Sequence, residues 1–286
     1  MNENIERRAG RILIALSAEV ETRLSLDVYR YLLGDAPPTF VGLLVENPRL
    51  IAHARAALAR EIVLSGVERR LEPESLERQL RARWSELRRW FETESARLGI
   101  PAEVTLVREN PRQALAKAIE RADALVVERD AAADALELWS SLPPPATLRA
   151  LLLAPPRWPL AGDVVVLADP GALAADSEAH RASEIETALR LARRTGAPLT
   201  VLATGSVDEN ARGRLARHAR ESGVRLAAVI PLRSATLDAL ADAARHASVL
   251  ILPSGISPEI AAAVATRLRG ATLLWRSTAS PPEART

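Results

Sequence analysis

The chain of 286 residues contains no cysteine, and this absence excludes three kinds of site. Without thiolates there is no disulfide framework, no cysteine nucleophile and no structural zinc site with sulfur ligands. Glycine is also scarce, because 13 of 286 residues is about 4.5%, against an average of roughly 7%. Loops that hold phosphate on backbone N–H groups need glycine, so the scarcity already argues against phosphate binding.

A surplus of one charge is missing as well. Lysine and arginine total 38 against 36 acidic residues, which gives a formal net charge of +2 despite a sequence pI of about 9.6. The pI is high because few groups titrate between pH 7 and 10: Lys117 is the single lysine, and there are two tyrosines. Arginines alternate with acidic residues, as over 78–89, and do not cluster. The sequence therefore predicts no nucleic-acid partner.

Long hydrophobic runs are absent too. The longest apolar stretches, such as 150–154 and 164–168, have the length of strands and not the roughly 20 residues of a membrane span. The polar start MNENIERR and the short apolar run 12–16 do not have the pattern of a signal peptide. We expect a cytoplasmic protein that is not embedded in a membrane.

What the chain does contain is an alternation of short apolar runs with amphipathic helical segments. In the first half the expected strands are 11–17, 39–45, 103–107, 124–127 and 149–154, and the expected helices are 18–33, one ending at Gly99 and 111–121. In the second half the expected strands are 163–168, 199–203, 225–230, 248–252 and 271–275, and the expected helices are 178–195, 208–222, 235–246 and 257–268. We expect Gly99, Gly196, Gly223 and Gly270 to cap the helices that precede them. Continuous apolar runs are typical of parallel strands buried on both faces, so the fold class is α/β.

The two halves repeat one another. Ser17 aligns with Asp169 at an offset of 152 residues, whereas Leu115 aligns with Leu240 at an offset of 125, so the first half carries an insertion of 152 − 125 = 27 residues. The insertion falls within 46–75. We predict two tandem domains, 9–157 and 162–277, joined at the proline-rich hinge 155–159. Each is expected to be a five-stranded parallel sheet flanked by helices.

The order of these segments resembles the universal stress protein family, whose fold is of the adenine nucleotide alpha-hydrolase type. The likeness covers about 8–276 and depends most on four segments: 12–16, 42–50, 107–115 and 122–127, the last reading ADALVV where the family reads ADLLVVG. The segment 71–80 looks like the tandem proteobacterial members. The resemblance implies that strands 150–154 and 272–275 pair within one chain as a pseudo-dimer, and it allows a homodimer.

In the ATP-binding branch of that family, an Asp ends the first strand and a G-x2-G-x9-G-[ST] motif follows the fourth. The first half of this chain lacks both features. Ser17 replaces the Asp, no glycine occurs between Gly99 and Gly162, and Glu128, Asp130 and Asp134 place negative charge where the triphosphate would lie. We therefore expect that this half has lost family-type ATP binding.

The second half keeps fragments of that site. Asp169 and Pro170 stand where the family's Asp stands, and Ser254, Gly255 and Ser257 resemble the end of the phosphate motif. As a nucleotide site they would hold ATP or another adenine nucleotide. The simpler interpretation is that Asp169-Pro170-Gly171 forms a turn and that Ser257 caps a helix, with Pro258 at its first position.

No other pattern indicates chemistry. The four histidines (His53, His180, His218 and His246) have no metal-ligand spacing, and no G-x-S-x-G occurs. We expect no catalytic residue, no metal and no cofactor. A weak ATPase activity stays open as an alternative.

The insertion allows two interpretations. Residues 49–63 fit a helix that covers the edge of the sheet, or an arm that docks a protein or an acidic surface. The resemblance implies a non-catalytic stress-response, regulatory or scaffold protein. The alternatives are an adenine-nucleotide-binding stress protein that uses its second half alone, and a partner of a membrane transporter.

Overall fold

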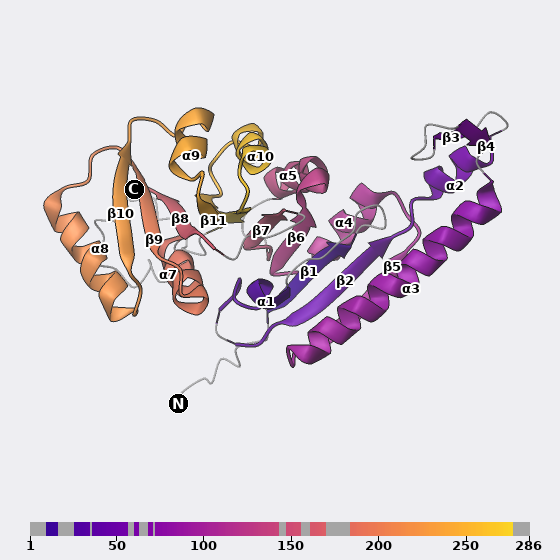
Figure 1. Cartoon of the computed structure of the whole chain (residues 1–286), viewed down its shortest axis with the longest axis horizontal. Coiled ribbons are helices and arrows are strands. Elements are labelled where there is room, and N and C mark those ends of the chain that lie inside the picture. Colours follow the sequence, from indigo (N-terminus) through magenta and orange to yellow (C-terminus); the bar gives the residue numbers. More distant parts are fainter. Residues whose placement is uncertain are drawn as a thin grey trace, which may run out of the picture.

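The fold of the computed structural model is built around one mostly parallel sheet (Figure 1). The structure describes residues 10–16, 26–34, 36–56, 60–62, 68–70, 72–142, 147–155, 161–169 and 184–276. The ten strands lie in the order β10-β9-β8-β11-β12-β7-β6-β1-β2-β5. From the first half come β1 (Arg11–Leu16), β2 (Thr39–Val45), β5 (Ala102–Val107), β6 (Ala124–Glu128) and β7 (Ala150–Ala154). From the second half come β8 (Asp163–Ala168), β9 (Leu199–Thr204), β10 (Leu226–Leu232), β11 (Ala247–Pro253) and β12 (Ala271–Trp275).

The sheet consists of two sets of five strands with the same internal order. If the strands of each half are numbered 1 to 5 in chain order, the sheet reads 3-2-1-4-5 across the second half and then 5-4-1-2-3 across the first half. The two sets meet where β7 and β12, the last strand of each, pair antiparallel, with Leu152 opposite Leu273. Every other pairing in this sheet is parallel. The α/β fold class is confirmed, and so is the expected pairing of the two fifth strands.

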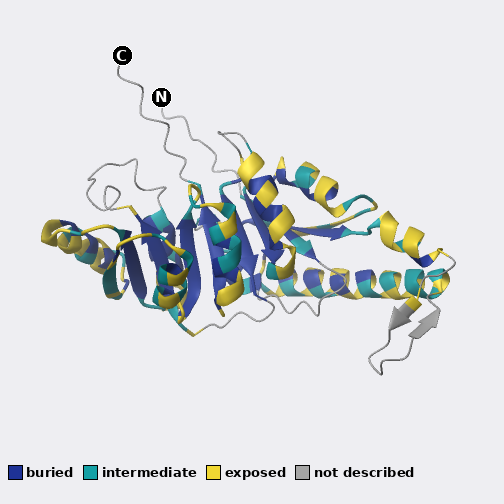
Figure 2. Ribbon diagram, turned by 90° about the horizontal axis from the view of Figure 1, so that it is seen from above, coloured by how far each residue is buried: buried dark blue, intermediate teal, exposed yellow. Residues whose placement is uncertain are grey.

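Helices cover both faces of the sheet, and the alternation of side chains along each strand supplies two separate cores. One face carries α1 (Leu26–Tyr29), α3 (Pro73–Arg97), α7 (Glu184–Thr195) and α8 (Glu209–Glu221). The opposite face carries α4 (Pro111–Ile119), α5 (Ala132–Ser141), α9 (Leu237–Ala243) and α10 (Pro258–Arg267). Ile12 and Ile14 of β1 face the first core, and Leu13 faces the second. Figure 2 shows the buried strands between these two helical layers. In the part of the chain that the structure describes, no helix is long and apolar enough to cross a membrane.

The insertion differs from its prediction. The helix expected over 49–63 ends early, as α2 (Pro48–Ala54), and it is followed by a small antiparallel hairpin of β3 (Arg60–Ile62) and β4 (Glu68–Arg70). Ala54 is the one buried residue of α2, and Arg55 and Ala56 after it are exposed. Nor do the described residues of the insertion cover the edge of the sheet. α2 packs against α3, and Leu106 on the edge strand β5 is 47% exposed.

Three further predictions need correction or qualification. Helix α5 was not among the expected helices; its buried Leu136 and Trp139 hold it against the sheet. Of the helices expected over 18–33 and 178–195, the described parts form α1 and α7, and most of the hinge 155–159 lies outside the described residues. Gly270 is not a helix cap. A Cβ on it would lie 2.2 Å from the carbonyl oxygen of Ala247, so this glycine serves a close backbone approach.

Candidate functional site

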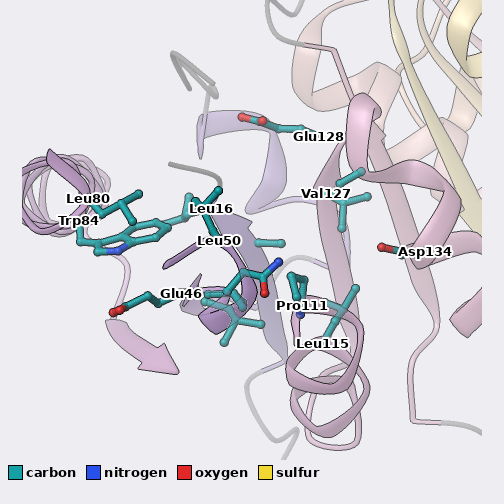
Figure 3. Close-up of a pocket in the computed structure, with 15 residues that line it drawn as sticks. Leu16, Glu46, Leu50, Leu80, Trp84, Pro111, Leu115, Val127, Glu128 and Asp134 are labelled. Carbon is teal, nitrogen blue, oxygen red and sulfur yellow. The ribbon is translucent and has the colours of Figure 1, made fainter. Parts of the chain in front are cut away.

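The best candidate for a site is a pocket at the carboxyl edge of the first half of the sheet. The chain turns to opposite sides of the sheet after β1 and after β6, and such a switch point in a parallel sheet is where α/β folds bind ligands. Ala15 and Leu16 end β1 at this place, and Val127 and Glu128 end β6 next to them. The pocket between them has a volume of about 250 Å³ (Figure 3).

Most of the pocket wall is apolar. The side chains that form it come from four strands and helices besides β1 and β6, and they include Leu43, Leu50, Leu80, Trp84 and Leu115. In Figure 3 the indole of Trp84 lies beside Leu80 and close to Leu16. Trp84 is 7% exposed and belongs to the core beneath α3, so its position is fixed by packing. Such a cavity favours an apolar ligand surface.

The polar part of the wall is acidic. Glu46, Glu128 and Asp134 line the pocket, and among its described lining residues there is no lysine, arginine or histidine. The carboxylate of Glu46 accepts a hydrogen bond from Nε of Arg108 at 3.0 Å, with Arg108 mostly in solvent. Glu128 is 4% exposed. Burial, and to a smaller extent the charge of Glu128, raise the pKa of Tyr29 well above its usual range. The electrostatic environment therefore disfavours an anion.

The segment after β6, where the resemblance places the phosphate motif, is helical. After Glu128 the chain enters a short 3-10 turn, η1 (Arg129–Ala131), and continues directly into α5. A glycine-rich loop would present backbone N–H groups to a phosphate at this point. Here Asp134 lies in the first turn of α5, and its carboxylate points towards the pocket in Figure 3. The acidic residues singled out in the sequence thus lie at the pocket, apart from Asp130, which is not among its lining residues.

The candidate residues of the second half lie at the equivalent edge, around β8 and β11. Asp169 follows β8 directly, and Ser254 directly follows β11, the strand that pairs with β8. Both residues are exposed, as is Gly255. Ser257 caps α10, because its Oγ accepts a hydrogen bond from the N–H of Ile260 at 3.3 Å. Pro170, the remaining candidate, lies outside the described residues, as does Ser17 in the first half.

The sequence did not reveal the apolar pocket itself. Leu50 and Trp84 lie 34 positions apart, on two different helices, and only their packing shows that they share a wall. The one available signal was that the insertion begins directly after β2, at an edge of the sheet where ligands bind.

A metal site is not apparent in the described ranges, since no three His, Asp or Glu side chains there could hold one ion. His218 is paired with Glu186 on the neighbouring helix α7.

No family model and no curated protein matches the sequence. Solved structures do match it. A universal stress protein from Archaeoglobus fulgidus DSM 4304 has a TM-score of 0.55 and 13% identity, over 93% of this chain and 96% of that one. A protein from Pseudomonas aeruginosa UCBPP-PA14 assigned to the universal stress proteins has a TM-score of 0.53 and 15% identity, over 94% of each chain. The cytoplasmic domain of a prokaryotic cation chloride cotransporter has a TM-score of 0.52 and 14% identity, over 94% of this chain and 96% of that one. At such identities the likeness shows that this chain shares the fold of these proteins.

Proposed function

We propose that this protein is a non-catalytic regulatory or scaffold protein of the universal stress type that has lost the family's way of binding ATP. The observation that carries this proposal is the pocket of the first half, in which η1 and α5 stand in place of a phosphate loop and three carboxylates line the wall. A triphosphate there would meet these carboxylates, and no lysine, arginine or histidine among the described lining residues would offset their charge.

The proposal includes the organisation of the chain. Domains 9–157 and 162–277 act together as an intramolecular pseudo-dimer, working in the cytoplasm. The antiparallel pairing of β7 with β12 supports it, because this pairing consumes the edge strand that each half would otherwise expose. A homodimer that extends the sheet would therefore have to pair through β5 or β10, the two strands at its ends.

A second candidate is an adenine-nucleotide-binding stress protein that uses its second half. The observation in its favour is that Asp169 and Ser254 follow the ends of two paired strands, β8 and β11, at the carboxyl edge and ahead of the N-terminus of α10. Against it stands the use of Ser257 as a helix cap, which occupies its hydroxyl with a backbone N–H.

A membrane transporter is a further candidate for the partner that this protein would regulate. It is supported by the likeness to the cytoplasmic domain of a cation chloride cotransporter, and by that observation alone. In this version the chain would be a separate regulatory subunit.

Thermal unfolding in the presence of millimolar ATP and Mg²⁺ tests the proposal. A ligand at 100 times its Kd stabilises the folded state by about 2.7 kcal/mol, which moves the Tm by several degrees. We expect no shift for the wild-type chain. A shift that Asp169→Ala abolishes would establish the second candidate instead.

A further inference from the structure

We infer that the insertion 46–75 builds a binding pocket for a compact, largely apolar molecule that is cationic or neutral and carries no phosphate. The pocket is the one at the carboxyl edge of the first half, and the inference rests on the proposed loss of ATP binding there. It gives the insertion a role that is neither an edge cover nor a docking arm.

The first step is the position of the insertion. Helix α3 has 25 residues and is about 37 Å long, whereas β5, which follows it, has six residues and spans about 20 Å. The helix therefore extends beyond the sheet, and because it precedes β5 in a parallel crossover, its N-terminal part overhangs the carboxyl edge (Figure 1). Leu80 and Trp84 on this part form one wall of the pocket.

The second step is how α2 is held against that overhang. Asn47 caps α2, its Oδ1 accepting a hydrogen bond from the N–H of Arg49 at 3.1 Å. At the other end, Nη2 of Arg55 is 3.1 Å from Oε1 of Glu77 on α3. These contacts place Leu50 on the pocket, where it is still 36% exposed. An exposed leucine at the mouth of an apolar cavity has surface left to bury against a ligand.

The third step is size. An apolar cavity of roughly 150 Å³ holds benzene, so a pocket of about 250 Å³ is suited to a molecule of the size of a bicyclic aromatic. The aliphatic side chains and the Trp84 indole provide the contact surface for such a ring system.

The fourth step is charge. Glu46 is paired with Arg108, and Glu128 is only 4% exposed, so the charge that a ligand would meet is that of Asp134. Asp134 is exposed in the first turn of α5 and faces the pocket (Figure 3), and the described lining holds no basic side chain. A basic group on the ligand would be attracted to this rim, whereas a phosphate or carboxylate would be repelled. Charge complementarity therefore selects a cationic or neutral ligand over an anionic one.

Three probes with one ring system separate these contributions: 1-naphthylmethylamine, which is cationic at pH 7, the neutral 1-naphthalenemethanol, and the anionic 1-naphthoate. Titration calorimetry with the full chain should show binding of the amine and the alcohol, with the amine at least about tenfold tighter than naphthoate. Failure of both the amine and the alcohol to bind at millimolar concentration overturns the inference, and so does equal or tighter binding of naphthoate.

Two variants locate the binding. Leu50→Ser should weaken the amine and the alcohol alike, by roughly three- to tenfold. Leu106→Ser is the matched control, since Leu106 is equally a large exposed leucine but lies on β5 away from this pocket. Asp134→Asn should lower the affinity for the amine towards that for the alcohol and leave the alcohol unchanged. Equal affinities of the Leu50→Ser and Leu106→Ser proteins would show that the naphthalene binds elsewhere and would reject the site.

ATP titrated into the same samples separates the two proposals. If ATP binds and competes with the amine, the proposed function is overturned. If neither ATP nor any naphthalene probe gives a heat of binding, the inference alone is overturned. Unchanged Tm values of the variants ensure that a loss of binding is not a loss of folding.

Discussion

Arg129 and Gly270 lie 141 positions apart in the sequence and are joined by a hydrogen bond of 2.8 Å, from Nη2 of the arginine to the carbonyl oxygen of the glycine. The bond connects the turn after β6 with the residue before β12, so it spans the two halves of the sheet. Burial lowers the pKa of Arg129, with Asp130 opposing this effect. On the same face, Arg276 lies over the ring of Trp139 with its Cζ 4.2 Å from the ring centroid. Two arginines thus reinforce the junction that β7 and β12 create.

Replacing Arg129 with alanine should destabilise the whole chain. A hydrogen bond from a charged donor contributes about 1.5–3 kcal/mol, and the partly buried carbonyl of Gly270 would lose this donor. Urea denaturation should show a loss within that range. The control is Arg112→Ala, which removes an exposed ion pair with Glu137 and should cost less than about 1 kcal/mol. Equal losses for both variants would contradict a special role for Arg129.

Gly270→Ala tests the close approach of β12 to β11. The new methyl group would lie 2.2 Å from the carbonyl oxygen of Ala247 and 2.5 Å from that of Ser248, and backbone atoms in a sheet have little room to move. We expect a loss of more than about 3 kcal/mol in the free energy of unfolding. Gly213→Ala in α8 is the opposite case, because nothing lies within 4 Å of its added methyl group. This second variant should gain about 0.5–1 kcal/mol.

These two glycines also indicate how far the sequence could predict the fold. Strands such as β8 and β12 have the predicted bounds because they are continuous apolar runs between polar turns. Gly99, Gly196 and Gly223 were expected as helix ends and have φ near +70°, a local requirement that the sequence carries by itself. A glycine is required at position 270 because the backbone of Ala247 approaches it closely. Ala247 is more than 20 residues earlier in the chain, so no local sequence pattern reveals this requirement.

The same distinction applies to the site. That no glycine-rich loop follows β6 could be predicted, because it depends on adjacent residues in the sequence. The apolar pocket could not, because α2 ends at Ala54 and α3 overhangs the sheet only as a result of packing between them. Likewise α5, which was not expected, is stabilised by burial of Leu136 and Trp139 against the sheet.

Ser257→Ala tests whether this serine is a cap or a ligand residue. Loss of the hydrogen bond to the N–H of Ile260 should cost about 1 kcal/mol. Asp208→Ala provides the comparison, since Asp208 caps α8 through the N–H of Ala211 and should cost a similar amount. A cap role predicts that ATP produces the same response before and after Ser257→Ala. A nucleotide response that disappears in this variant alone would speak for a ligand role.

The continuous sheet predicts that both halves unfold together. Trp139 on α5 belongs to the first half and Trp275 on β12 to the second, and both are buried. In protein labelled with 5-fluorotryptophan, ¹⁹F signals assigned through Trp139→Phe and Trp275→Phe should disappear at one common urea concentration. Two separate midpoints would mean that the pairing of β7 with β12 does not couple the halves.

The central claim is that a universal-stress-type fold is present without its nucleotide. The most direct measurement is isothermal titration of ATP with Mg²⁺ into the full-length wild-type chain, with Asp169→Ala in parallel. We predict no heat of binding for either protein up to millimolar ATP. Saturable heat with a stoichiometry of one or two per chain would contradict the claim, and its loss in Asp169→Ala would assign the nucleotide to the second half.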